Sequence, residues 1–132
     1  MVQILVLGAI LCALVLMVFN YIELKTYKEG TAEMADIAKI IRDGAKTFMV
    51  AEYKTIVVVV IIVAALFSLF IEKTAGLTFI LGSCMSSATC IIGMRSATYA
   101  NVRTANTARV THSIGETVSV ALMGGSISGL SV

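Results

Sequence analysis

The feature that most constrains this chain is a stretch of twenty-one residues, 74–94, without a single charged side chain. As a helix rising 1.5 Å per residue, this stretch is about 30 Å long, which matches the hydrocarbon core of a bilayer. Residues 1–22 and 55–71 are also uncharged. Only 14% of all residues are charged, well below the roughly 25% typical of soluble domains. The sequence therefore predicts a membrane protein.

We expect an all-α fold, a polytopic transmembrane helix bundle with spans at about 1–22, 53–71, 74–100 and 116–132. The first span is predicted to be retained, because no Lys or Arg precedes it and no A-x-A cleavage site follows. The fourth run continues for only sixteen residues after Glu116, whereas a span needs about twenty. We therefore expect a truncated fourth span and a single membrane domain, 1–132, that is the N-terminal part of a longer architecture.

Residues 31–50 predict an amphipathic helix within the first loop. Apolar residues recur at helical spacing, namely Met34, Ile37, Ile41, Ala45 and Phe48. Thr31 is placed to cap this helix, and Glu33 lies in the first turn, where the helix dipole favours an anion. Its apolar face is expected to lie on the membrane surface or on neighbouring helices.

Small residues in the third span predict a surface for helix packing. They recur three or four apart, at Gly82, Ser86, Thr89 or Cys90, Gly93 and Ala97, a spacing that lets helix backbones approach closely in lipid. Gly125 and Gly129 form a G-x-x-x-G pair in the fourth span, a pattern that also occurs by chance in membrane helices. After Met94 the chain becomes polar and basic, and residues 95–115 are predicted to leave the membrane as a loop.

No catalytic, cofactor-binding or metal-binding residue is predicted within the chain. Asp36 and Asp43 lie two turns apart, but neighbouring Lys39 and Arg42 favour a solvated ion-pair face over a metal site. His112 has no acid or second histidine nearby and is expected in a solvated loop. The three cysteines, Cys12, Cys84 and Cys90, lack C-x-x-C spacing and are predicted to be small, buried, free thiols. A net charge of +2 gives no support for nucleic-acid binding.

The distribution of Lys and Arg predicts the orientation. Residues 20–54 contain six, residues 95–115 contain three, and only Lys73 separates the second and third spans. The positive-inside rule therefore places loops 20–54 and 95–115 in the cytoplasm and the N-terminus outside a cell membrane.

Several ordered blocks resemble the N-terminal part of the membrane-bound, ion-pumping inorganic pyrophosphatases. The resemblance covers nearly the whole chain, and its blocks are Ile37-Ala38, Ile40-Ile41, Gly44-Ala45 with Phe48, Glu52 to Ile56, Phe79, Leu81-Gly82, Ser86, Gly93-Met94, Ala97 to Ala105, Ala108-Arg109, Gly124-Gly125 and Gly129-Leu130. Cys90 and Met123 depart from the family, where glycine and a polar or basic residue are usual.

The resemblance implies a large homodimeric enzyme that hydrolyses pyrophosphate in the cytoplasm and moves H+ or Na+ outward. Family members hold Mg2+ with aspartate clusters, and K+ is a further candidate cofactor. Because this chain has only two aspartates, the working parts are expected in helices beyond Val132, with residues 1–132 as an inactive outer layer of the pump. The alternative is a free-standing four-helix scaffold or accessory subunit, which the reading frame after codon 132 would distinguish.

Overall fold

The computed structural model describes all residues, 1–132, as four α-helices joined by short connections. They are α1 (Val2–Thr26), α2 (Ala32–Phe70), α3 (Lys73–Thr111) and α4 (Ile114–Ser131). Three of them, α1, α2 and α3, are long and apolar enough to cross a membrane. The predicted fourth span is helical as α4 but is not among these three. The all-α fold is confirmed.

The two central helices are longer than the sequence predicted. With 39 residues each, α2 and α3 are about 60 Å long, roughly twice the thickness of the hydrocarbon core. The predicted loop helix 31–50 is not separate, because it continues without interruption into the second apolar run. No proline or glycine lies between residues 45 and 75 to end the helix.

Much of the predicted loop 95–115 is also helical, since α3 continues to Thr111 and ends at His112 in the left-handed conformation. The prediction of a polar exit into water is wrong for Arg103, Asn106 and Thr107, which are buried. The cap at the start of α2 is confirmed, because the Thr31 side chain accepts a hydrogen bond from the Met34 amide.

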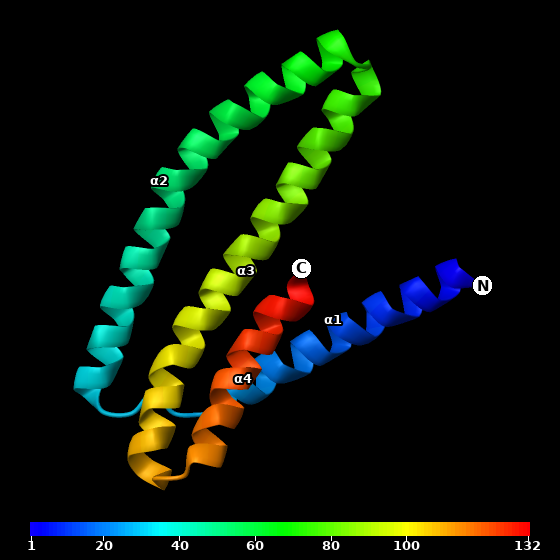
Figure 1. Ribbon diagram of the computed structural model, residues 1–132. Helices are drawn as coiled ribbons and strands as arrows, with labels where there is room; N and C mark the ends of the chain where they lie inside the picture. The colour runs from blue at the N-terminus through cyan, green and yellow to red at the C-terminus, as the bar shows by residue number, and fades with distance from the viewer.

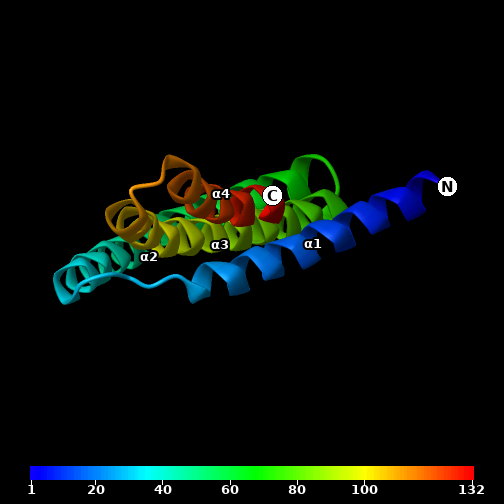
Figure 2. The same ribbon diagram turned by 90° about the horizontal axis from the view of Figure 1, so that it is seen from below.

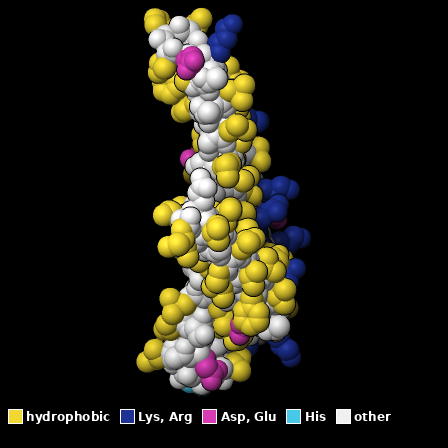
Figure 3. Space-filling view, turned by 90° about the vertical axis from the view of Figure 1, so that its right-hand side faces the viewer, with side chains coloured by type: hydrophobic (Ala, Val, Ile, Leu, Met, Phe, Trp, Pro, Cys, Tyr) yellow, Lys and Arg dark blue, Asp and Glu magenta, His cyan; other side chains and the backbone are white.

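The helices form an open row in which each contacts the next: α2 on α3, α3 on α4, and α4 on α1 (Figure 1). No contact joins the backbones of α1 and α2. Figure 1 shows α1 diverging from the other helices toward the N-terminus, and Figure 2 shows residues 27–31 crossing past α3 to reach α2. Figure 3 shows hydrophobic side chains over most of one face, while Lys and Arg gather along its edge. The exposed apolar surface suits lipid or further helices rather than water.

The α2–α3 hairpin is closed by a close approach near its turn. A Cβ added at Gly76 would overlap the Ser68 hydroxyl and lie 2.6 Å from the Ala64 carbonyl oxygen. One turn further along α3, the rings of Phe67 and Phe79 meet edge to face with centroids 5.2 Å apart. Gly76 therefore allows the two long helices to meet directly after a minimal turn.

The α3–α4 contact uses only part of the predicted small-residue surface. Gly93 is buried against Ser128, and the Ser96 hydroxyl donates a 2.9 Å hydrogen bond to the Gly124 carbonyl. Gly82 and Ser86 are exposed, and a Cβ added at Gly82 would meet nothing within 4 Å. These two residues take no part in the α3–α4 contact, and their packing against other helices stays a prediction. Which small residues of α3 face α4 depends on where the two helices cross. The spacing of small residues in the sequence does not specify this crossing point.

The G-x-x-x-G pair makes no close contact either. A Cβ added at Gly125 or Gly129 would meet nothing within 4 Å, whereas one added at Gly124 would overlap the Cβ of Ala100. The close approach of α4 to α3 therefore depends on Gly124, one residue before the predicted pair.

We predict that Gly124→Ala destabilises the folded chain relative to Gly125→Ala. Both substitutions remove the same backbone entropy cost of a helical glycine, but only the first forces α4 away from Ala100. We expect the free energy of unfolding in detergent to fall by about 1–3 kcal/mol for Gly124→Ala relative to its neighbour. Equal stability of the two variants would contradict the close contact.

Candidate functional site

The most highly connected polar group in the chain is Arg103, on the half of α3 beyond its apolar run. It is 6% exposed. Its Nε donates to the Tyr27 carbonyl at 3.0 Å, and its Nη1 donates to the Tyr99 carbonyl one turn earlier, also at 3.0 Å. Its guanidinium lies over the Tyr99 ring, 4.7 Å from the centroid. A guanidinium suits this position because its donors diverge in a fixed plane.

Glu29, in the connection between α1 and α2, joins this arginine to a second one. Arg42 on α2 donates to both Glu29 carboxylate oxygens, at 2.8 and 3.4 Å, and Arg103 Nη1 lies 3.3 Å from Oε1. Arg42 also lies over the Tyr99 ring at 5.2 Å. The paired arginines lower the pKa of Glu29, with the hydrogen bond from Arg42 the main cause. The same hydrogen bond raises the pKa of Arg42.

Asn106 completes the contacts with the connection. Its Nδ2 donates to the Lys28 carbonyl at 3.2 Å, and its Oδ1 accepts a 3.0 Å hydrogen bond from Arg109. Gly30 adopts a φ of +100°, and a Cβ there would lie 2.8 Å from Asn106 Oδ1. Glycine is therefore required at position 30 both for its backbone conformation and for space.

We call Glu29, Arg42, Tyr99, Arg103 and Asn106 the linker cluster, because they fix residues 27–30 across α3. No buried side-chain nitrogen or oxygen in the chain lacks a hydrogen-bond partner. The hydrogen bonds of the cluster thus join separate segments of the chain to one another. The sequence reasoning missed this cluster because Arg103 was assigned to a solvated loop. A signal was present: Tyr99, Arg103 and Asn106 recur at helical spacing and so share one face of α3.

The structure brings together no group of three or more His, Cys, Asp or Glu side chains that could hold a metal. Asp36 and Asp43 are both exposed on α2, and neither forms an ion pair. His112 is exposed at the end of α3. Cys12, Cys84 and Cys90 are free, but they are exposed, so the prediction that they are buried is wrong within this chain.

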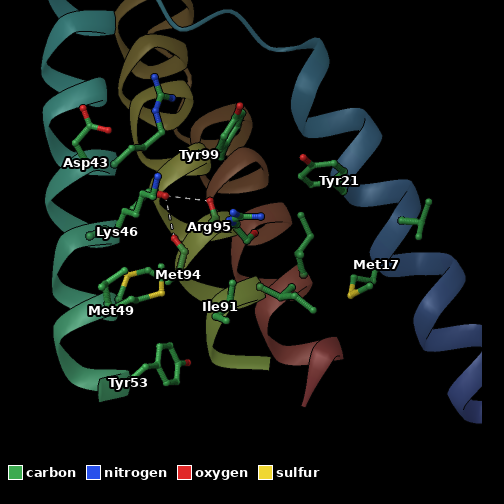
Figure 4. Close-up of a pocket in the computed structure, with 18 residues that line it drawn as sticks. Met17, Tyr21, Asp43, Lys46, Met49, Tyr53, Ile91, Met94, Arg95 and Tyr99 are labelled. Atoms are coloured by element: carbon green, nitrogen blue, oxygen red, sulfur yellow. Dashed lines mark hydrogen bonds between the residues drawn. The ribbon is translucent and has the colours of Figure 1, made fainter. Parts of the chain in front are cut away.

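A groove of about 770 Å³ lies between α1 and α2, with α3 as its base. Twelve of its eighteen lining residues are hydrophobic, including Met17, Met49, Ile91 and Ile127. Figure 4 shows Lys46 extending from α2 toward α3, and Arg95 extending from α3 toward α1. The groove is therefore lined mostly by apolar side chains and is basic where Lys46 and Arg95 lie.

The family described as inorganic H+ pyrophosphatase matches residues 11–132. The chain is 43% identical over 113 residues to the K(+)-stimulated pyrophosphate-energized sodium pump of Thermotoga maritima, covering 86% of this chain and 16% of that protein. It is 38% identical over 122 residues to the K(+)-insensitive pyrophosphate-energized proton pump 2 of Moorella thermoacetica, covering 90% and 18%.

A third relative is the K(+)-insensitive pyrophosphate-energized proton pump of Methanosarcina mazei, 33% identical over 105 residues, covering 78% of this chain and 15% of that protein. These three matches span only 15–18% of the length of the relatives. The similarity thus covers most of this chain and a small part of each pump.

We predict that Glu29 makes the stability of the chain sensitive to acid. Because the arginines lower its pKa in the folded state below the ordinary 4.5, its ion pairs stabilise the fold fully above pH 4.5. This stabilisation is lost as the pH falls through the lower, folded-state pKa. Glu29→Gln should lower the stability measured in detergent at pH 7 and flatten its decline below pH 4.5.

The matched control is Glu33→Gln, since Glu33 is exposed at the start of α2 and forms no ion pair. This variant should keep the wild-type acid profile. An acid profile for Glu29→Gln that is indistinguishable from wild type would show that the linker cluster does not stabilise the fold.

Proposed function

This chain belongs to the inorganic H+ pyrophosphatase family, and we propose that it forms the N-terminal outer-helix segment of a pyrophosphate-energised ion pump. The observation that carries the proposal is the match of residues 11–132 to the family, together with relatives named as sodium or proton pumps. In the full-length protein, pyrophosphate hydrolysis drives the transport of Na+ or H+ across the membrane.

Within that pump the role of this segment is structural. Pyrophosphate hydrolysis requires carboxylates that hold Mg2+ and cations that neutralise the developing phosphate charge. The structure places no three or more His, Cys, Asp or Glu side chains together, which supports assigning the metal and the substrate, as part of this proposal, to helices outside residues 1–132. K+ dependence, which the names of some relatives mention, is assigned to those helices as well. The partners of this segment are the lipid bilayer, those further helices and a second copy of the pump.

For the orientation, we propose that the linker cluster lies on the cytoplasmic side and the α2–α3 turn lies outside. Nine of the ten Lys and Arg residues lie in 20–54 and 95–115, which favours this arrangement. A cysteine placed at Lys28 in the full-length pump should react with an impermeant thiol reagent only from the cytoplasm. Reaction from outside the cell would reverse the topology.

The experiment for the proposed function compares two proteins in liposomes at equal molar amounts. The polypeptide encoded by the full reading frame should release phosphate from pyrophosphate with millimolar Mg2+ and transport Na+ or H+. Residues 1–132 alone should release no more phosphate than empty liposomes.

Two outcomes would contradict the proposal. A reading frame that stops at codon 132, with no further helices encoded, would support a free-standing scaffold instead. Phosphate release by residues 1–132 that is lost in Asp36→Ala or Asp43→Ala would place the active site within this chain.

A further inference from the structure

We propose that the groove between α1 and α2 receives a helix from the part of the pump outside residues 1–132, and that this helix brings a carboxylate to Lys46 and Arg95. The inference rests on the proposed function, because it requires the full-length pump. To the proposed function, the inference adds where the segment contacts the rest of the pump and which side chain the contacting helix carries.

The groove is a mostly apolar surface bounded by α1, α2 and α3. The backbones of α1 and α2 do not meet, and the groove lies between them on α3. Figure 4 shows labelled lining residues from all three helices. The opening is lined by apolar side chains from α1, α2 and α3, with Ile127 from α4. Several of these residues, such as Met17 and Ile91, belong to the predicted membrane spans. In a membrane this surface is covered by lipid or by protein, since water is absent there.

The charges on the groove are not balanced. Arg42 is paired with Glu29, but Lys46 and Arg95 form no ion pair and donate no side-chain hydrogen bond, although both line the groove. Asp43 is the single acid in the lining. Two free cations against one carboxylate leave an excess positive charge. Once a helix excludes water from this level, that charge requires a carboxylate partner, because an unpaired buried charge is strongly destabilising.

The relatives indicate that the groove is filled by a helix of the same polypeptide. The matched segment makes up 16% of the Thermotoga maritima pump and 18% of the Moorella thermoacetica pump, so most of such a protein lies outside the described helices. A helix of the same polypeptide is present at high effective concentration, and it fills a groove without the cost of bringing in a separate molecule. An anionic phospholipid would satisfy the same cations, and the experiment separates the two.

The test places a photo-crosslinking amino acid at Met49, in the groove, within the full-length pump in native membranes. We expect a crosslink within the same polypeptide to a helix outside residues 1–132, with Asp or Glu within one turn of the crosslinked residue, identified by mass spectrometry. The control position is Ile61 on the same helix, which is exposed and does not line the groove. It should not yield that peptide.

The second arm reverses the free charges with Lys46→Glu and Arg95→Glu together. This double variant should lose the crosslink from Met49 in the full-length pump. It should leave the thermal unfolding of residues 1–132 alone unchanged, because neither side chain has a partner within this chain.

Crosslinking of Met49 to phospholipid, to a second copy of the chain, or to nothing would overturn the inference. So would a Met49 crosslink that survives the charge reversal. Pyrophosphate hydrolysis is measured on the same preparation. Normal hydrolysis with a lipid crosslink would reject the helix contact alone, whereas absent hydrolysis in the unmodified pump would reject the proposed function.

Discussion

The arrangement of the four helices depends on how the connection between α1 and α2 crosses α3. Residues 27–31 are not helical, so their backbone carbonyls need partners from elsewhere. Arg103 and Asn106 on α3 supply these partners at Tyr27 and Lys28. Glu29, within the connection, forms ion pairs with Arg42 of α2 and Arg103 of α3. Arg103 thus joins the connection to α3, and Glu29, which pairs with both arginines, joins it to α2 through Arg42.

The remaining packing follows from this crossing. With the connection fixed on α3, α1 is directed onto α4 while α2 lies on the other side of α3. Small residues then allow α3 to contact both of its neighbours closely, with Gly76 beneath Ser68 of α2 and Ala100 beside Gly124 of α4. Because α1 and α2 are held apart, the row remains open between them. The open row and its exposed apolar surface are typical of an outer layer of helices that packs against further helices and lipid.

The sequence predicted the parts of the fold that depend on local chemistry. Uncharged runs located the three membrane-length helices, and Thr31 was recognised as a cap. The continuity of α2 was missed because the charges around Glu52 and Lys54 suggested a boundary, although charged residues do not end a helix. Gly124 and the burial of Arg103 could not be predicted, because both depend on where α3 meets another segment. The family, by contrast, was recognisable from ordered blocks that required no knowledge of packing.

The central claim is that Arg103 holds α1 and α2 in a fixed relation, and a distance measurement by electron paramagnetic resonance tests it directly. One spin label is placed on the native Cys12 of α1 and the other on a cysteine at Val58 of α2, with Cys84 and Cys90 replaced by alanine. Residues 1–132 in nanodiscs should give a narrow distribution of distances, and Arg95→Gln should preserve it. Arg103→Gln should broaden it markedly. An unchanged narrow distribution in Arg103→Gln would contradict the account.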